Sequence, residues 1–426
     1  MIEKSISISV LDAANIPDYI INTKDIVEKF EENKVLKNHF NIIMHFDIMD
    51  GKFVPNTGID LKYIKTAKSL GFYADTHLMV EEPIYEGYIQ KAILNGTDCI
   101  TIHFEIDNFE KVLNYLNEQK DILIKNENKR LDIGVAIKPN TNIEELIKYK
   151  DKFSKLLIMS VEPGFGGQKY IEDINIKIKL AMEKFKEHII QLDGGVNITT
   201  ISDAYICGAD SFVIGTYLSK CDIKNEYDTL IALNSLKQLL DLPRNSNVDF
   251  DTKLLQILPG GYGEGDSLLG IKVPDTRKLA NKLYKILPIE NLTGFITSKY
   301  HEYRRFALFC MSNMIKSKKD VVDYKEVIDF FDKNIEYINN WDLTDEAGPN
   351  ILGLYLLKID MSKRKLKLEE YILNKNIWIK RIGIVSLLTL VRKNIFDLPL
   401  EIIDSVVYQS NHLLQKASRL GFKGNI

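Results

Sequence analysis

Two short segments of this chain hold residue types that can do chemistry. His45 and Asp47 lie two positions apart in a run typical of a β-strand, where alternate side chains share one face. An imidazole and a carboxylate on one face form half of a metal site. Gly164, Gly166 and Gly167 follow another apolar run, and such a glycine-rich backbone can surround a phosphate. A metal and a phosphate on one scaffold predict sugar-phosphate chemistry.

The elements that must position these residues recur along the first part of the chain. Short apolar runs alternate with amphipathic stretches, which predicts parallel βαβ units. The eight runs are Ser5–Leu11, Ile42–Asp47, Phe72–His77, Cys99–His103, Leu131–Ile137, Leu156–Val161, His188–Asp193 and Ser211–Gly215. Eight units favour an α/β fold of the (β/α)8 TIM-barrel type, with a doubly wound sheet as the alternative. We prefer the barrel because it gathers all strand ends around one mouth, and the unusual residues occur at those ends. They are Asp47, His77, Glu105, Pro139, Gly164, Asp193 and Gly215.

Two histidines and two aspartates at these strand ends predict a metal site. His45 and Asp47 end the second run, His77 ends the third and Asp193 ends the seventh. Either histidine alone is more simply explained as a polar residue with a satisfied hydrogen bond. Four such residues at matching strand ends favour a shared site instead. The set suits one divalent cation per barrel, Zn²⁺ or Fe²⁺ in preference to Mn²⁺ or Co²⁺.

The composition is that of a globular protein with two domains. The chain has 426 residues, of which 45% are hydrophobic and 27% are charged. No run approaches the ~20 apolar residues of a membrane span, and the N-terminus lacks the layout of a signal peptide. We therefore expect a cytoplasmic protein with no membrane partner. Four scattered cysteines without metal-ligand spacing predict reduced thiols.

A polar segment, Leu242–Asn247, interrupts the helical periodicity and marks a domain boundary. We assign residues 1–242 to the barrel, 243–249 to a linker and 250–426 to a second domain. The second domain is predicted to be all-α and built of helical repeats. Its helical windows are Thr276–Ile286, Tyr303–Ile315, Tyr324–Asn334, Asn350–Leu357 and Ile377–Arg392.

Charge is distributed unevenly between the two parts. Residues 251–426 hold 27 Lys and Arg against 21 Asp and Glu, a balance of +6. Subtraction from the totals of 56 and 59 leaves 29 against 38 for residues 1–250, a balance of −9. Only the second part therefore has a charge balance that suits nucleic acid.

Residues 5–220 resemble the ribulose-phosphate 3-epimerase family. The motifs that carry the resemblance are Ser9-Val10-Leu11, His45 to Gly51, Phe53-Val54-Pro55-Asn56, His77-Leu78-Met79-Val80, Val161 to Lys169 and Asp193-Gly194-Gly195. The resemblance implies a metal-dependent enzyme that interconverts D-ribulose 5-phosphate and D-xylulose 5-phosphate by inverting C3 through an enediolate. It makes His45, Asp47, His77 and Asp193 the metal ligands, and the two aspartates also the catalytic acid and base. The alternative is the related family that acts on allulose 6-phosphate, although the loop and turn motifs are closer to the ribulose-phosphate enzymes.

The same resemblance implies a set of substrate-binding residues. The phosphate would lie against the loops after the sixth to eighth strands, while Ser9 and His77 would contact the rest of the substrate. The phosphate-loop residues are Gly164, Phe165, Gly166, Gly167, Gly194, Gly195, Gly215 and Thr216. Thr216 replaces the family's usual serine and keeps the hydroxyl group. We also expect a homo-oligomer formed through the barrel.

Residues 250–417 resemble the DNA alkylation repair glycosylases built from HEAT-like helical repeats. The carrying motifs are Tyr262 to Asp266, Gly270 to Pro274 with Arg277, His301 to Arg304, Asn339 to Asp345, Trp378 to Arg381 and Gln415-Lys416-Ala417. The resemblance implies a site for duplex DNA in which Asp345 stabilises a departing cationic base, Trp341 lies one turn away and Arg381 contacts the DNA backbone. The alternative interpretation makes Asn340 or Asp342 a helix cap and Trp341 a core residue.

After Ala417 the sequence departs from this second family. Leu420 stands about where a second tryptophan is expected, and the sequence runs on only to Ile426. We therefore expect a lesion site from which one aromatic side chain is missing. The domain would bind DNA, with at most weak alkylbase DNA glycosylase activity, or serve as a scaffold, or be a decayed copy of the family. The main hypothesis is an epimerase with an appended helical domain, and the rival is a DNA-binding or repair protein whose barrel is only a carrier. The intact acid–base and metal residues favour the epimerase.

Overall fold

The computed structural model describes residues 4–33, 35, 39–219, 223–317, 322–406 and 413–417. The chain divides into two compact units, Met1–Leu240 and Asp241–Ile426. Among the described residues, no helix has the length and apolar character needed to cross a membrane.

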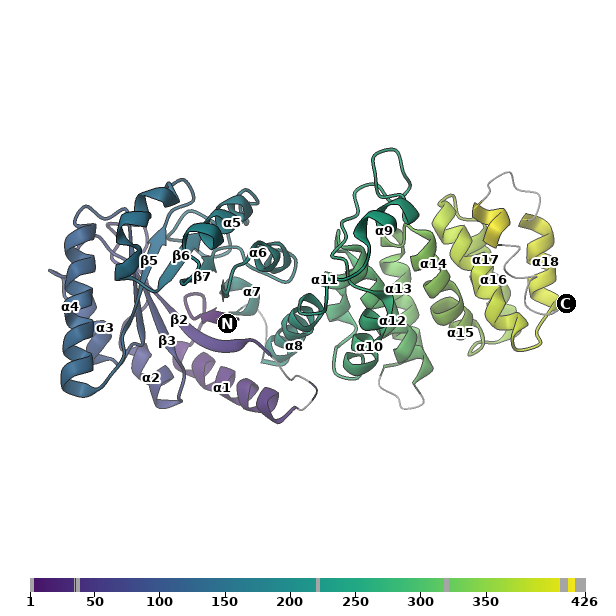
Figure 1. Ribbon diagram of the computed structural model, residues 1–426. Coiled ribbons are helices and arrows are strands. Elements are labelled where there is room, and N and C mark those ends of the chain that lie inside the picture. The colour runs from purple at the N-terminus through teal and green to yellow at the C-terminus, as the bar shows by residue number, and fades with distance from the viewer. Residues whose placement is uncertain are drawn as a thin grey trace. The chain divides into compact units, whose positions relative to one another are not determined.

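The first unit is a closed barrel of eight parallel strands in chain order, drawn from purple to teal in Figure 1. Each strand pairs with its neighbour in sequence and β1 pairs with β8, so no strand edge is left open. The strands are β1 (Ser5–Ser9), β2 (Asn41–Met49), β3 (Ala74–Met79), β4 (Cys99–His103), β5 (Asp132–Ile137), β6 (Lys155–Met159), β7 (Ile189–Asp193) and β8 (Ser211–Ile214). The predicted (β/α)8 barrel is confirmed, and every strand overlaps its predicted run.

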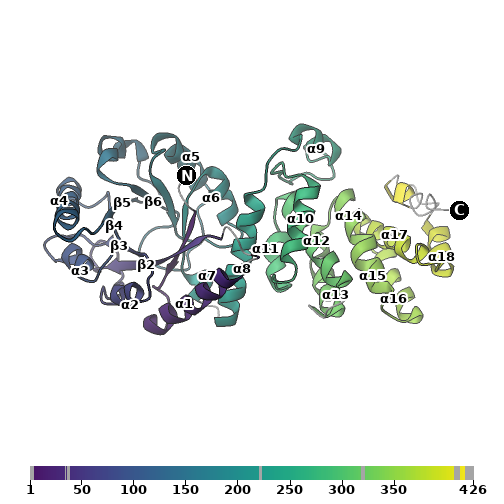
Figure 2. The ribbon, with the colours of Figure 1, turned by 60° about the horizontal axis from the view of Figure 1, so that its bottom comes forward.

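Helices form the outer layer of this barrel, as Figure 2 shows. They are α1 (Ile16–Glu32), α2 (Tyr63–Ser69), α3 (Tyr88–Leu94), α4 (Phe109–Glu127), a 3₁₀ helix (Ile143–Lys152), α5 (Ile174–Lys184), α6 (Ile201–Cys207), α7 (Thr216–Ser219) and α8 (Ile223–Leu240). Local sequence explains α1 well. Its cap Asn15 accepts a hydrogen bond from the amide of Asp18, and Ile20, Ile26 and Phe30 recur on one buried face.

The strands are buried along nearly their whole length because barrel strands face side chains on one side and helices on the other. Parallel pairing brings all their carboxyl ends to one mouth. In the pairing of β2 with β3, Asp47 lies opposite His77, and in the pairing of β6 with β7, Met159 lies opposite Asp193. Strand register therefore decides which side chains meet at the mouth.

The second unit is helical, as predicted; its described residues contain no strand beyond isolated bridges. Its α-helices are α9 (Val248–Leu254), α10 (Val273–Leu283), α11 (Thr293–Ile296), α12 (His301–Lys316), α13 (Tyr324–Lys333), α14 (Trp341–Ala347), α15 (Gly353–Leu356), α16 (Met361–Ile372), α17 (Ile377–Val391) and α18 (Asp397–Val406). Two 3₁₀ turns (Glu290–Leu292 and Ile335–Tyr337) and a π-helical turn (Gly348–Leu352) accompany them. The sequence windows missed α9, α11, α14, α16 and α18. The first three have seven residues or fewer and so show little periodicity, whereas α16 and α18 have 12 and 10 residues.

Helix α17 is the centre of this unit, and most of its side chains are buried. Two glycines let the segment from α14 to α15 approach it closely. A Cβ atom at Gly353 would lie 2.7 Å from Cβ of Thr389, and one at Gly348 would lie 2.9 Å from the carbonyl oxygen of Ile382. These glycines are required by packing rather than by a turn.

Candidate active site

Four side chains from three strands meet at the mouth of the barrel. His45 and Asp47 come from β2, His77 from β3 and Asp193 from β7, and one ligand atom of each lies within 4.8 Å of all the others. Oδ1 of Asp47 is 3.3 Å from Nε2 of His45 and 3.1 Å from Nδ1 of His77. Oδ2 of Asp193 is 3.9 Å and 3.4 Å from the same two nitrogen atoms. The strand-end residues that the sequence singled out are thus brought together.

This group fits a divalent cation. Nε2 of His45 is buried and has no hydrogen-bond partner, although it is surrounded by ligand atoms. A buried lone pair of this kind is costly unless something binds it. Two imidazoles and two carboxylates are a donor set that Zn²⁺ or Fe²⁺ accepts. A cation among these four side chains would satisfy the unpaired nitrogen.

The electrostatic field at the site favours positive charge. Burial alone would lower the pKa of His45, but the charges of Asp47 and Asp75 outweigh it and raise that pKa to about 10. Burial would raise the pKa of Asp47, yet the neighbouring His45 and His77 hold it well below its usual value. The pKa of His77 is raised despite its burial, through Asp193 and Asp47. The carboxylate of Asp47 is therefore kept ionised and ready to bind a cation.

Behind His45 lies a buried polar network on the barrel axis. Nδ1 of His45 is 3.0 Å from Oδ2 of Asp75, and the other oxygen of Asp75 accepts a hydrogen bond from the ammonium of Lys155. Nε2 of Gln191 donates to Oδ2 of Asp75 at 2.9 Å. Burial would raise the pKa of Asp75, but Lys155 and His45 lower it. Because Asp75 holds Nδ1, the ring of His45 is oriented with Nε2 toward the metal group.

His77 is oriented through its Nε2 atom, whereas His45 is oriented through Nδ1. Nδ1 of His77 faces the two aspartates, while its Nε2 is 3.0 Å from Nε2 of His103. Nδ1 of His103 is in turn 3.0 Å from Oε2 of Glu105. Burial lowers the pKa of His103 to about 4, so this ring stays neutral and can accept the Nε2–H of His77. The backbone amide of Lys138 and the hydroxyl group of Thr141 hold Glu105 by donating hydrogen bonds to its Oε1.

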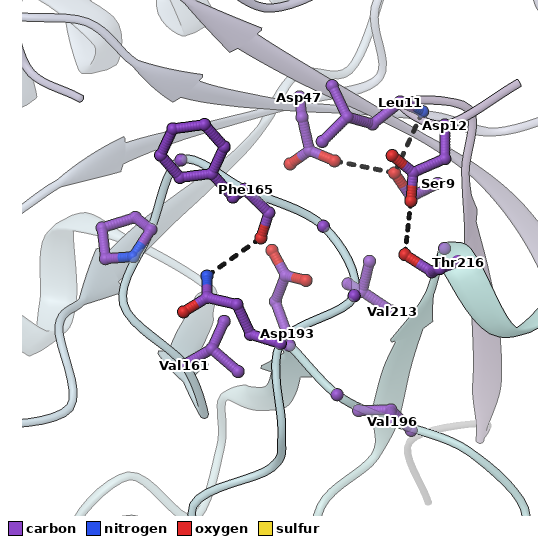
Figure 3. Close-up of a pocket in the computed structure, with 18 of the residues that line it drawn as sticks. Ser9, Leu11, Asp12, Asp47, Val161, Phe165, Asp193, Val196, Val213 and Thr216 are labelled. Carbon is purple, nitrogen blue, oxygen red and sulfur yellow. Dashed lines mark hydrogen bonds between the residues drawn. The ribbon is translucent and has the colours of Figure 1, made fainter. Parts of the chain in front are cut away.

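A pocket opens above the metal group and contains most of the predicted substrate residues, as Figure 3 shows. Of the predicted set, Ser9, Asp47, Gly164, Phe165, Gly166, Gly167, Asp193, Gly194, Gly195, Gly215 and Thr216 line it, with Met49 and Met79. Ser9 Oγ donates to Oδ2 of Asp47 at 2.7 Å and so orients that carboxylate. Gly194 has a φ of +115°, and a Cβ there would lie 2.4 Å from a methyl group of Val161. Only glycine fits that turn.

Several residues of the site were not singled out from the sequence. Asp12 and Gln168 line the pocket, and Asp75, Lys155 and His103 stand behind the two histidines. A signal existed for Asp75, which lies two residues before His77 and therefore shares its face of β3. Lys155 and Asp12 meet their partners only through the barrel closure, so local patterns do not indicate their roles.

In the second unit, the predicted lesion residues also lie together. Trp341 and Asp345 are on α14, and Arg381 is on α17. Arg381 is only 2% exposed, and its Nη2 and Nε donate to Oδ1 of Asp345 at 2.7 Å and 3.1 Å. Its Nη1 donates to the carbonyl oxygen of Leu413 at 2.7 Å. The guanidinium of Arg381 therefore lies inside the protein in an ion pair with Asp345, and its contact to the DNA backbone stays a prediction.

The cap interpretation of this segment holds for Asn340, whose side chain accepts a hydrogen bond from the amide of Trp341. Trp341 itself is half-buried and donates from Nε1 to the carbonyl oxygen of Leu254 at 3.3 Å. Nearby, the rings of Tyr262 and Trp378 meet edge to face with centroids 5.2 Å apart. Leu420 lies outside the described residues.

Fold and site together define a (β/α)8-barrel enzyme with two histidines and two aspartates at its mouth. Residues 20–219 match the model of the ribulose-phosphate 3 epimerase family, and residues 247–418 match that of the DNA alkylation repair enzymes. The cytoplasmic isoform of ribulose-phosphate 3-epimerase from Oryza sativa subsp. japonica is 33% identical over 179 residues, which cover 41% of this chain and 73% of the relative.

Two further relatives give the same result. The ribulose-phosphate 3-epimerase of Eremothecium gossypii is 36% identical and that of Bacillus subtilis is 33% identical. Each alignment covers 41% of this chain, and they cover 73% and 77% of the two relatives. The chain belongs to the ribulose-phosphate 3-epimerase family, and its barrel is an epimerase. The resemblance drawn from the motifs is therefore confirmed, including the fusion of the two domains.

Proposed function

We propose that the barrel interconverts D-ribulose 5-phosphate and D-xylulose 5-phosphate by moving a proton at C3. The names of its relatives support this substrate. The observation that carries the proposal is the placement of Asp47 and Asp193, which come from β2 and β7 and line one pocket. Inversion of a carbon needs one group to remove a proton and a second group to return one to the other face.

In this proposal Asp47 removes the proton in one direction and Asp193 returns it, and the roles exchange in the reverse direction. Figure 3 shows the two carboxyl groups entering the pocket from different sides. Ser9 holds one oxygen of Asp47, which restricts the carboxylate to one orientation. Asp47 and Asp193 both lie within 4 Å of ring nitrogens of His45 and His77, so the acid–base pair and the metal group share the same side chains.

His45, Asp47, His77 and Asp193 would hold one divalent cation, with Zn²⁺ or Fe²⁺ favoured by the donor set. When bound, the cation supplies positive charge that stabilises the enediolate formed next to the ketone. Asp75 and His103 would orient the two imidazoles from their far nitrogen atoms.

The phosphate would bind at the other end of the pocket, against the loop Gly164–Gly167, the turn Gly194-Gly195 and Thr216. Glycines there leave backbone amides accessible to an anion. Gly194 and Gly195 have φ values of +115° and +64°, so the turn adopts a backbone that few other residues tolerate. Phe165 is exposed on the same loop and would cover the substrate.

Assays on metal-stripped and reconstituted full-length protein test this proposal. Activity on ribulose 5-phosphate should vanish without metal and return with added Zn²⁺ or Fe²⁺, while allulose 6-phosphate should be the poorer substrate. Full activity of the stripped protein, with metal content verified, would refute the metal requirement. A clear preference for allulose 6-phosphate would instead reassign the substrate.

For the second unit we propose weak binding of duplex DNA, which rests on the match to the DNA alkylation repair family. Asp345 is already paired with Arg381, so little of its charge is free to stabilise a cationic base. The domain boundaries at 242 and 250, a homo-oligomer of barrels and a cytoplasmic location stay predictions of the sequence.

A further inference from the structure

The pocket contains a carboxylate that neither the metal group nor the acid–base pair uses. Asp12 follows β1 and lines the pocket together with Gly166, Gly167 and Thr216. Its Oδ2 accepts a hydrogen bond from the hydroxyl group of Thr216. Figure 3 shows the two side chains facing each other across the pocket wall.

Gly166 makes the space for this carboxylate. A Cβ atom at Gly166 would lie 2.5 Å from Oδ2 of Asp12 and 3.0 Å from Oγ1 of Thr216. Asp12 thus occupies the gap between the glycine-rich loop and Thr216. That gap is the place which the proposed function gives to the phosphate of the substrate.

The other charged residues of the pocket determine how the carboxylate of Asp12 affects a bound phosphate. Its charged lining residues are Asp12, Asp47, Glu162 and Asp193, and none of the described lining residues is a lysine or an arginine. Asp47 and Asp193 belong to the metal group and would be neutralised by the cation. Asp12 is exposed and has no such neutralising partner in the pocket. A phosphate dianion that entered would therefore meet an uncompensated carboxylate at short range.

We propose that Asp12 sets how tightly this pocket binds a phosphorylated substrate. Without substrate, the carboxylate of Asp12 accepts a hydrogen bond from the Thr216 hydroxyl group. The carboxylate must rotate toward solvent before the phosphate can accept that hydrogen bond instead. The competition weakens phosphate binding but leaves the chemistry at C3 unchanged, because Ser9 positions Asp47 independently of Asp12. Asp12 is thus a specificity-determining residue, and the inference rests on the proposed function.

Replacing Asp12 with Asn tests the inference in the full-length, metal-loaded protein. The amide removes the charge but keeps an oxygen that can accept from Thr216. KM for D-ribulose 5-phosphate should fall about 10-fold as the repulsion disappears, while kcat should stay within about 2-fold. KM for free D-ribulose, which has no phosphate, should not change. Asp18→Asn is the matched control, since Asp18 is also exposed near the start of α1 but lies outside the pocket.

Titration with inorganic phosphate gives a readout that needs no turnover. By calorimetry, Asp12→Asn and Asp12→Ser should bind phosphate about 10-fold more tightly than the unmodified protein. Equal or weaker phosphate binding in both variants, with unchanged thermal midpoints, overturns the inference. If neither the unmodified protein nor the variants turn over ribulose 5-phosphate, the proposed function fails, and the phosphate titration still decides the role of Asp12.

Discussion

At the scale of single residues, the two histidines of the site present opposite ring nitrogens to the metal group. His45 presents Nε2 to the metal group because its Nδ1 is hydrogen-bonded to Asp75. His77 presents Nδ1 because its Nε2 is hydrogen-bonded to His103. Each imidazole is thus fixed by a partner of different charge, an anion in one case and a neutral ring in the other. Loss of such a partner typically weakens metal affinity by about 10–100-fold.

Asp193→Asn should abolish the incorporation of solvent deuterium at C3 of ribulose 5-phosphate. The amide cannot return or remove a proton, although it can remain near the cation. Nuclear magnetic resonance of the product in deuterated water measures the exchange. Undiminished exchange in a folded, metal-containing variant would end the two-carboxylate mechanism.

The double variant Asp75→Asn with Lys155→Met should weaken metal binding by about 10–100-fold. Both charges are removed together, so no buried charge is left unpaired, but His45 loses its anionic acceptor. Competition with a chromogenic chelator measures the affinity. Asp98→Asn with Lys68→Met is the matched control, because that ion pair of 2.6 Å lies outside the metal group. Equal affinity in the two double variants would contradict the role given to Asp75.

At the scale of elements, the packing of α1 against α8 encloses an acidic residue. Glu226 on α8 is 2% exposed, and its Oε1 accepts a hydrogen bond from Thr23 on α1 at 3.2 Å. Burial raises the pKa of Glu226 to about 7, and the hydrogen bonds from Thr23 and Tyr19 lower it only in part. The folded barrel therefore holds this proton more tightly than the unfolded chain, where the pKa is about 4.3.

The sign of this shift predicts that the barrel loses stability as the pH rises. The contribution of Glu226 is complete below about pH 4 and is lost as the pH passes through about 7, which amounts to about 1–3 kcal/mol. Glu226→Gln cannot ionise, so its thermal midpoint should exceed that of the unmodified protein at pH 8 and match it at pH 4. Glu28→Gln, an exposed position on α1, is the control. Equal midpoints of the Glu226 variant and the unmodified protein at pH 8 would refute the buried-charge explanation.

At the scale of the whole molecule, two units with separate cores share one chain. The closed barrel contains all eight of its strands within Met1–Leu240, and the helical unit has its own buried centre in α17. Among the described residues, those that line the barrel pocket or form the metal group all lie before position 240. The two chemistries can therefore be tested one at a time.

A fragment of residues 1–242 should fold and keep the epimerase activity of the full chain, because it contains the complete barrel and its site. Circular dichroism and steady-state kinetics of the fragment check this. A fragment that is insoluble or inactive beside an active full chain would show that the barrel needs the helical unit.

Duplex DNA should bind weakly to the full chain and dissociate as salt is raised, because residues 251–426 carry a balance of only +6. Release of 7-methylguanine should be slow, since Arg381 already neutralises Asp345. Gel shifts at several salt concentrations and a base-release assay measure both. Rapid release that is lost in Asp345→Asn but kept in Asp360→Asn, an exposed control, would contradict this expectation.

The sequence alone determined the strand pattern, the barrel and the four residues that meet at its mouth. Those features follow from the alternation of side chains along each strand and from the residue types at the strand ends. Both are properties of neighbouring residues in the sequence. Only the tertiary structure revealed the partners across the barrel: Thr216 and Asp12 are 204 positions apart, and Lys155 and Asp75 are 80 apart. It also revealed the ion pair that joins Arg381 on α17 to Asp345 on α14. Such contacts depend on which strands and helices close onto one another, and no local pattern encodes that geometry.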